Sequence, residues 1–218
     1  YLNTASEKYD VAADGSVISP PDLEALEASA KRLRDDGIEC AAVALLHGDV
    51  NPGHERAVAS LLRRFGFRVV CKSGDVAPFV KLLPRAQTTV IEAALSPIVS
   101  SYLERIASSL PGGRLDALTS AGGLVPSRSF RAKDSLLSGP AAGCSGALAA
   151  MRAEGIQQAV TLDMGGTSTD VARLDQHGVA IRLEADVAGV AVAAPSVDVR
   201  SVAAGGGGIC VATAGGLF

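Results

Sequence analysis

The sequence predicts an α/β fold, and two observations carry this prediction. Segments whose apolar residues recur at helical spacing alternate with short apolar runs of the kind that form buried strands. Hydrophobic residues make up 48% of the 218-residue chain, which is enough to build a core, and charged residues make up an ordinary 20%. Such a composition does not predict disorder, and this length accommodates one large domain or two small ones.

The first half of the chain has the pattern helix, strand, helix, strand, which is typical of a parallel sheet. Ser19 is expected to cap the first helix, and Gly37 ends it. Asn51 is expected to cap the second helix, and Gly66 ends it. The residues before Ser19 predict only a hairpin or a loop. The predicted strands are residues 40–46, which we expect to be buried on both faces, and residues 67–71.

The second half begins with a long predicted helix from Gln87 to Ser109, which Pro97 is expected to kink. A second helix, rich in small residues, is predicted from Cys144 to Ala153. Short strands are predicted around these helices. The apolar residues that share one face of the long helix are Ile91, Leu95, Ile98, Tyr102 and Ile106, and the predicted strands are residues 115–118, 159–162, 179–183, 187–192 and 197–202.

The segment Asp163-Met164-Gly165-Gly166-Thr167-Ser168-Thr169-Asp170 lies between two apolar runs and predicts a strand, a tight polar turn and a returning strand. Its two glycines let a ligand approach the backbone, and its three hydroxyl residues are donors suited to phosphate oxygens. Asp163 and Asp170 are carboxylates of the kind that hold Mg²⁺ directly or through water. A hairpin turn without a ligand is the alternative, but such turns do not need this density of donors and acids.

Two further glycine-rich segments are candidate ligand sites. Ser138-Gly139-Pro140-Ala141-Ala142-Gly143 precedes a helix and can present free amides to an anion, although close helix packing explains the same residues. Gly205-Gly206-Gly207-Gly208 follows a predicted strand, where it forms either a linker or a backbone surface against which a nucleotide lies. The apolar residues after it argue against a linker.

Several classes of protein are disfavoured by composition. The net charge is −3 and aromatic residues make up only 4%, which argues against a nucleic-acid surface. Cys40, Cys71, Cys144 and Cys210 form no C-x-x-C pair, so we expect inert thiols in a reducing, cytoplasmic setting. We expect no signal peptide and no membrane span. The first residue is Tyr1 and not Met, and we expect the chain to be a piece of a longer protein.

The segment from Asp163 to Asp170 resembles the D-x-G-G-T-x-x-D phosphate loop of the actin-like ATPase superfamily. A set of motifs from residue 38 onward narrows this resemblance, because in this order it is similar to the hydantoinase A and 5-oxoprolinase family, which includes N-methylhydantoinases and acetone carboxylase subunits. The motifs are Ala44 to Gly48, Asn51 to Glu55, Thr88 to Val90, Ser120 to Leu124, Leu137 to Gly143 and Ala204 to Gly208.

The resemblance implies an actin-like, ribonuclease H-like ATPase fold that is incomplete here, with one phosphate loop of two. It implies two regions: residues 1–86 from the family's N-terminal region, and residues 87–218 from the start of its hydantoinase A domain. It also implies ATP-dependent hydrolysis of a cyclic amide, of hydantoin or 5-oxoproline type, through phosphorylation of the amide carbonyl oxygen. An ATP-binding subunit of a ketone carboxylase, a non-catalytic assembly partner and a small-molecule kinase are the alternatives.

The resemblance further implies ATP and Mg²⁺ as cofactors, a hydantoinase B-type partner subunit or domain, and no activity for this segment alone. Asp163 and Asp170 would be catalytic and would hold the metal. No chemistry is assigned to His47 and His54, which match family positions. The expected nucleotide-binding residues are Gly165, Gly166, Thr167 and Ser168 around the phosphates, Ser138, Gly139 and Gly143 along the cleft, and Gly205, Gly206 and Gly207 beside the adenosine.

The chain departs from the family pattern at two places. Where the family usually reads H-T-I-G-A-G-G-G-S, this chain has Arg200 for the histidine, Ala203 for a glycine and Gly208 for the serine. Residues 83–87 stand where the family tends to have an E-R-T-S element. These departures keep the alternative of a non-catalytic subunit open.

Overall fold

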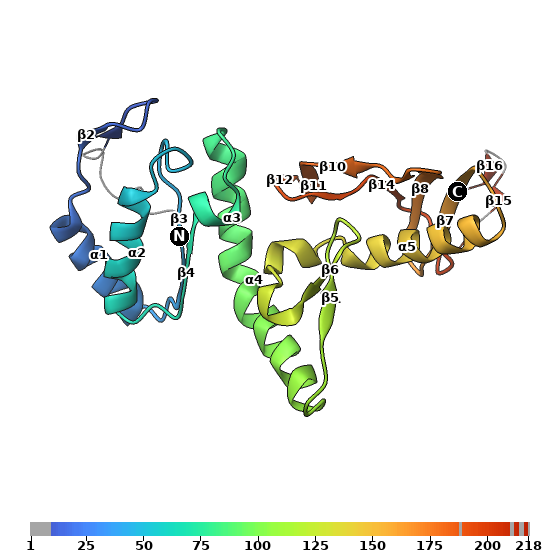
Figure 1. Cartoon of the computed structure of the whole chain (residues 1–218), viewed down its shortest axis with the longest axis horizontal. Coiled ribbons are helices and arrows are strands. Elements are labelled where there is room, and N and C mark those ends of the chain that lie inside the picture. The colour runs from blue at the N-terminus through green and yellow to red at the C-terminus, as the bar shows by residue number, and fades with distance from the viewer. Residues whose placement is uncertain (1–9, 188, 210–211, 214–215, 218) are drawn as a thin grey trace. The chain divides into compact units, whose positions relative to one another are not determined.

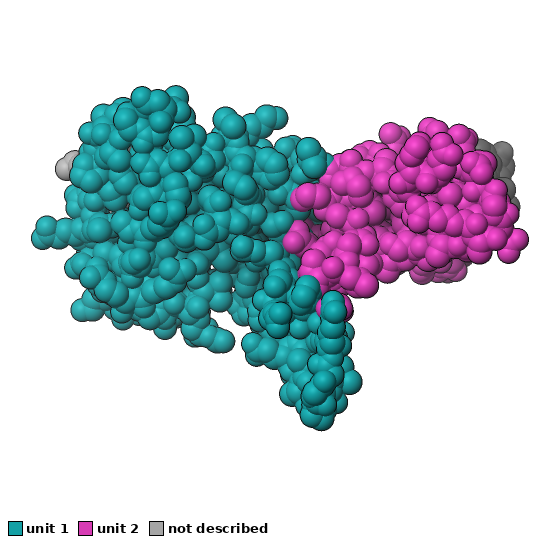
Figure 2. Space-filling model, viewed as in Figure 1, with its two compact units in different colours: residues 1–115, 126–133, 183–194 teal, residues 116–125, 134–182, 195–218 magenta. Residues whose placement is uncertain are grey.

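The computed structural model describes residues 10–187, 189–209, 212–213 and 216–217 of the chain (Figure 1). The chain forms two compact units, each assembled from separated segments (Figure 2). One unit comprises Tyr1–Leu115, Pro126–Lys133 and Leu183–Ala194, and the other comprises Asp116–Val125, Asp134–Arg182 and Pro195–Phe218. The expected division at residues 86 and 87 stays a prediction about family regions, and both residues lie within one helix here.

The first unit contains the expected helix, strand, helix, strand pattern. A short hairpin precedes it, and the two longer strands pair in parallel, as predicted. The helices pack against each other through a core of Ala30, Leu61 and Phe67. The elements are β1 (Asp10–Val11), β2 (Val17–Ser19), α1 (Leu23–Asp35), β3 (Cys40–Val43), α2 (Gly53–Arg64) and β4 (Val69–Lys72).

Three local predictions in this unit are wrong, and one of them is the cap of α2, which is Pro52 and not Asn51. The cap of α1 is Asp22, not Ser19, because the Asp22 carboxylate accepts a hydrogen bond from the amide of Ala25. The strand expected over residues 40–46 ends at Val43 and is only partly buried. It ends early because the amide of Leu45 donates to the carboxylate of Glu55 (3.0 Å) and not to a neighbouring strand.

The unit continues with α3 (Ser73–Val76) and the long helix α4 (Leu82–Ser108), which begins five residues before the predicted start. The buried residues of α4 are mostly polar, whereas Ile98 and Tyr102 of its apolar stripe are 68% and 55% exposed. Polar groups are tolerated inside because they find partners. The carboxylate of Glu92, for example, accepts a hydrogen bond from the amide of Lys133 (2.8 Å). The buried residues of α4 are Arg85, Thr88, Thr89, Glu92 and Ala93.

A pair of adjacent, fully buried threonines on α4 tests this arrangement. The hydroxyl of Thr88 accepts a hydrogen bond from the amide of Ala193 (2.7 Å), whereas the hydroxyl of Thr89 only donates to a carbonyl of its own helix. We expect Thr88→Val to reduce the free energy of unfolding by about 1 to 3 kcal/mol, because it leaves a buried amide unpaired. Thr89→Val should have little effect. Denaturant unfolding of both variants checks this, and equal losses would contradict it.

The second unit is built on an antiparallel sheet in the order β14, β8, β7, with β9 also paired to β8. Helix α5 (Ser138–Ala153) covers one face of the sheet and packs Cys144 and Met151 against Ala172 and Leu174 (Figure 1). On the other face Val160, Leu162 and Met164 are exposed. The strands are β7 (Gln158–Met164), β8 (Thr169–Asp175), β9 (Gly178–Val179) and β14 (Val199–Val202).

Helix α5 begins six residues before the predicted start at Cys144. Pro140 is tolerated in its first turn, because the first four amides of a helix have no partner within the helix. A short hairpin and two 3₁₀ turns precede α5. They are β5 (Asp116–Leu118), β6 (Leu124–Pro126), η1 (Ser127–Ser129) and η2 (Ala132–Ser135).

The remaining predicted strands are interrupted. Residues 187–192 form two strands and not one, because Gly189 adopts a left-handed conformation and its amide donates to Asp186. The runs 179–183 and 197–202 are likewise divided between separate pairings. The elements are β10 (Ile181–Arg182), β11 (Ala185–Val187), β12 (Val190–Val192), β13 (Ser196–Val197), β15 (Ala212–Thr213) and β16 (Gly216–Leu217).

Candidate functional site

The turn between β7 and β8 has the predicted strand–turn–strand form. Asp163 pairs with Asp170 across the two strands, and Met164 pairs with Thr169. The turn is closed by a hydrogen bond from the amide of Gly165 to the carbonyl of Ser168 (2.8 Å). Residues 165–168 therefore form a short loop at the end of a regular hairpin. It is called the phosphate loop below, after the role expected from the sequence.

The backbone of the phosphate loop has carbonyls that are bonded and amides that are available. The carbonyls of Gly165 and Gly166 accept hydrogen bonds from the amides of Gly206 and Gly207. In contrast, the amides of residues 166–168 donate to no acceptor among the residues that the structure describes. Gly166 and Thr167 are exposed. Consecutive free amides of this kind are suited to binding an anion.

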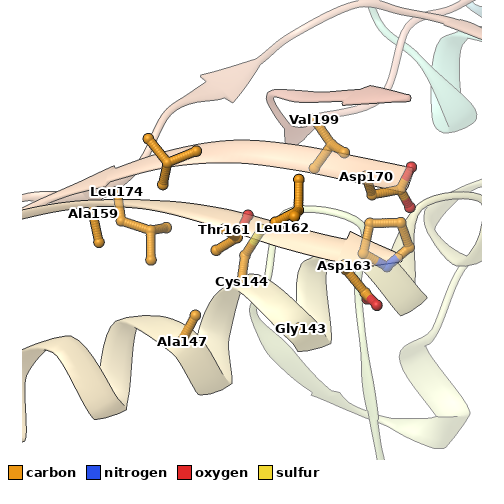
Figure 3. A pocket seen from close by; sticks show the side chains of 12 residues that line it. Gly143, Cys144, Ala147, Ala159, Thr161, Leu162, Asp163, Asp170, Leu174 and Val199 are labelled. Atoms are coloured by element: carbon orange, nitrogen blue, oxygen red, sulfur yellow. The ribbon is translucent and has the colours of Figure 1, made fainter. Parts of the chain in front are cut away.

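Asp163 and Asp170 lie together at one end of the hairpin, on the same face of the sheet as α5 (Figure 3). The hydroxyl of Ser201 donates a hydrogen bond to the Asp170 carboxylate. Gly143 of α5 lies beside Asp163: a Cβ built on Gly143 would be 3.5 Å from Asp163 Oδ2. Both carboxylates can therefore offer oxygens to a cation near the phosphate loop.

A cavity of about 280 Å³ lies between α5 and the sheet, with these two acids at one end. Its other end is apolar and includes Ala147, Ala159 and Leu174 (Figure 3). Of the residues expected along the cleft, Gly143 lines this cavity, but Ser138 and Gly139 do not. The hydroxyl of Ser138 instead donates to the carbonyl of Ser135.

The expected residues therefore fall into separate groups. Gly165 to Ser168, the two acids and Gly143 come together around the end of the hairpin. Gly205 to Gly207 contact the backbone of the phosphate loop, and their expected place beside the adenosine stays a prediction. Sequence reasoning missed Ser201, which is the partner of Asp170. Only the register of β14 against β8, which the local sequence does not contain, would have revealed it.

The cysteines of the described chain add no nucleophile to the site. Burial, with a smaller contribution from Glu92, raises the pKa of the Cys71 thiol to about 11. Burial also raises the pKa of Cys144, which lies in the wall of the cavity. A thiol reacts as its thiolate, so neither side chain is activated near neutral pH.

The motif that contains His47 and His54 builds a buried polar cluster in the first unit. Glu55 is fully buried, and its carboxylate accepts hydrogen bonds from the amide of Leu45 (3.0 Å), the amide of Gly74 (2.9 Å) and the hydroxyl of Ser73. Arg85, also fully buried, donates to the carbonyl of Leu45 (2.9 Å). These contacts give the motif an architectural role.

Residues 85–218 match the family model described as hydantoinase/oxoprolinase, and residues 4–66 match the model of the hydantoinase/oxoprolinase N-terminal region. The chain is 38% identical over 198 residues to 5-oxoprolinase 1 of Arabidopsis thaliana, and this match covers 88% of the chain and 15% of the relative. It is 31% identical to the caprolactamase subunit alpha of Pseudomonas jessenii, covering 91% of the chain and 30% of that subunit.

Two solved structures resemble the chain. The ATP-dependent caprolactamase from Pseudomonas jessenii aligns with a TM-score of 0.83 and 29% identity, over 94% of this chain and 31% of that one. A nucleotide-free acetone carboxylase aligns with a TM-score of 0.81 and 25% identity, over 90% of this chain and 29% of that one. These likenesses confirm the predicted α/β ATPase-like fold.

The chain spans a small share of each relative's length, from 15% of the Arabidopsis enzyme to 30% of the caprolactamase subunit. Among the residues that the structure describes, no helix combines the length and the apolar character that crossing a membrane requires. The matched family model covers more than half of the chain, and its residues include the phosphate loop and both acids. The chain belongs to the hydantoinase/oxoprolinase family.

Proposed function

We propose that this chain supplies the phosphate-binding part of an ATP-dependent hydrolase that opens a cyclic amide of hydantoin or 5-oxoproline type. One observation carries the proposal: the free amides of residues 166–168 lie next to the carboxylates of Asp163 and Asp170. The relatives named 5-oxoprolinase and ATP-dependent caprolactamase support both the use of ATP and the class of substrate.

The residues of this site fit ATP and Mg²⁺. Amides with no acceptor among the described residues suit phosphate oxygens, and the hydroxyls of Thr167 and Ser168 lie in the same loop. Within the described chain no cluster of three or more His, Cys, Asp or Glu side chains could enclose a metal. A pair of carboxylates is nevertheless enough for Mg²⁺, which keeps several waters and takes further oxygens from phosphates.

Bound ATP would supply a phosphoryl group that converts the amide oxygen, a poor leaving group, into one that can be expelled. The amides of residues 166–168 would hold the phosphates by hydrogen bonds in a fixed orientation. Asp163 and Asp170 would hold Mg²⁺ or its waters, and Ser201 would keep the Asp170 carboxylate in place. The apolar end of the cavity would limit the access of water.

The proposal is tested with the intact protein and its candidate partner subunit. The name of the caprolactamase subunit alpha, one of the relatives, supports such a partner. Purified protein, with and without the partner, is supplied with Mg-ATP and hydantoin, 5-oxoproline or caprolactam. We expect phosphate release that depends on one of these rings and equals the amount of ring opened. ATP hydrolysis that no cyclic amide stimulates would contradict the proposal.

The similarity to acetone carboxylase supports a second candidate function, the ATP-binding subunit of a ketone carboxylase. This alternative predicts that acetone together with bicarbonate stimulates ATP hydrolysis and that cyclic amides do not. For either function, we expect the 218-residue chain alone to bind Mg-ATP weakly and to turn over no substrate.

The free thiols of Cys40, Cys71 and Cys144 support the proposed cytoplasmic location.

A further inference from the structure

We propose that Gly205 and Gly207 are positioning residues that support the phosphate loop from behind and do not contact the nucleotide. This proposal rests on the proposed function and changes the role of the glycine run, which the sequence led us to expect beside the adenosine. It assigns the run to the opposite side of the loop from the ligand. The reasons are the hydrogen bonds of its amides and the closeness of its backbone to the loop.

The amides of Gly206, Gly207 and Gly208 are already bonded. Gly206 donates to the carbonyl of Gly165 (2.9 Å), and Gly207 donates to the carbonyl of Gly166 (2.8 Å). The next amide, that of Gly208, donates to the carbonyl of Gly205 (3.0 Å). An amide engaged in this way is not available to a phosphate or a base. The phosphate loop has the complementary arrangement, because its bonded carbonyls leave the amides of residues 166–168 available.

Glycine is required at position 205 because the backbone there lies very close to the backbone of the phosphate loop. A Cβ on Gly205 would lie 2.6 Å from the carbonyl carbon of Gly166 and 2.6 Å from the amide nitrogen of Thr167. Both atoms belong to the backbone, so neither can turn away as a side chain would. A Cβ on Gly207 would lie 2.8 Å from the carbonyl oxygen of Gly166. None of Gly205, Gly206 and Gly207 has a positive φ, so the backbone conformation by itself does not require glycine there.

Gly206 is different, although it lies between these two residues. The nearest atom to a Cβ on Gly206 is the carbonyl oxygen of Gly165, at an ordinary contact distance of 3.8 Å. Gly206→Ala is therefore a matched control for Gly205→Ala. Both substitutions add one methyl group to the same glycine run, but only the one at position 205 displaces the phosphate loop.

The segment that holds the glycines also binds the two residues that follow the loop. The hydroxyl of Thr169 donates to the carbonyl of Ala204 (2.6 Å), and the hydroxyl of Ser201 donates to the Asp170 carboxylate. Residues 201–207 therefore form a strap that fixes the loop backbone and one of the proposed metal ligands together. A shift of this strap would disturb phosphate binding even though the strap itself lies outside the binding surface.

The test uses the intact protein and compares Gly205→Ala with Gly206→Ala. Calorimetric titration gives the affinity for Mg-ATP, and competition with a fluorescent ATP analogue gives the affinity for adenosine, which lacks phosphates. We expect Gly205→Ala to lower the affinity for Mg-ATP by about tenfold or more and to leave the affinity for adenosine unchanged. We expect Gly206→Ala to change neither affinity.

Thr169→Val provides a variant that adds no clash, in case Gly205→Ala does not fold. It removes the hydrogen bond to Ala204 and should weaken Mg-ATP binding, again without an effect on adenosine. A loss of adenosine affinity in Gly205→Ala or Gly206→Ala, or equal Mg-ATP affinities in these two variants, would overturn the positioning role. An unsubstituted protein that binds no Mg-ATP would instead overturn the proposed function.

Discussion

Replacement of Asp163 by alanine in the intact protein is expected to abolish Mg²⁺-dependent ATP hydrolysis and to weaken Mg-ATP binding by about tenfold or more. Asp163 lies next to the phosphate loop, and its carboxylate is one of the two that can hold Mg²⁺ or its waters. The fold should not change, because the side chain is exposed and the described structure shows no hydrogen bond to it. Titrations with ATP in the presence and absence of Mg²⁺ measure the effect.

The matched control for this prediction is Glu154→Ala, which removes an exposed carboxylate at the C-terminal end of α5 in the same unit. It alters net charge equally and should leave nucleotide affinity unchanged. Asp163→Asn keeps the shape of the side chain but removes its charge, so its Mg-ATP binding should need higher Mg²⁺ concentrations. Unchanged nucleotide affinity in Asp163→Ala would contradict the assignment of this carboxylate to the metal.

The second large effect is expected from Glu55→Ala, which should lower the free energy of unfolding by about 3 kcal/mol or more. The substitution leaves the amides of Leu45 and Gly74 and the hydroxyl of Ser73 without their buried acceptor. It also removes the carboxyl group that packs against the buried turn at Gly48, where a Cβ would lie 2.8 Å from the Glu55 carboxyl carbon. A domain with a total stability of about 5 to 15 kcal/mol would lose a large part of it.

Denaturant unfolding, followed by circular dichroism, measures this loss. Glu27→Ala serves as the control, because Glu27 is a half-exposed carboxylate on α1 whose ion pair with Arg64 spans 3.8 Å. Exposed pairs of this kind contribute about 1 kcal/mol or less. Comparable losses in the two variants would show that the buried cluster around Glu55 is not the support that the structure indicates.

The hairpin turn at residues 165–168 was predictable because its signal is local. Glycines, hydroxyl residues and flanking acids within eight positions indicate the turn, and the hairpin register then brings Asp163 opposite Asp170. The binding of phosphate and metal by this turn stays a prediction. The parallel pairing of β3 and β4 was predictable for a similar reason, since a helix between two apolar runs places them side by side. Both features follow from segments that are consecutive in the sequence.

Features that depend on distant residues were not predictable. The polar buried face of α4 is stable because its side chains accept hydrogen bonds from backbone amides more than forty positions away in the sequence. Thr88 accepts one from the amide of Ala193, and Glu92 accepts one from the amide of Lys133. Periodicity detects apolar stripes and contains no information on such partners. Likewise the glycine run was visible in the sequence, but only the structure shows that a Cβ on Gly205 would lie 2.6 Å from the loop backbone, on which its proposed supporting role rests.

The exposed row Val160, Leu162 and Met164 has a practical consequence for work with this chain in isolation. β7 ends the strand order of its sheet, so among the described residues its outer edge offers unpaired backbone groups next to that apolar row. Such an edge is a template for pairing with another copy of the same polypeptide. The isolated chain should therefore aggregate as the protein concentration rises. Biophysical work on the phosphate loop is best done in dilute samples.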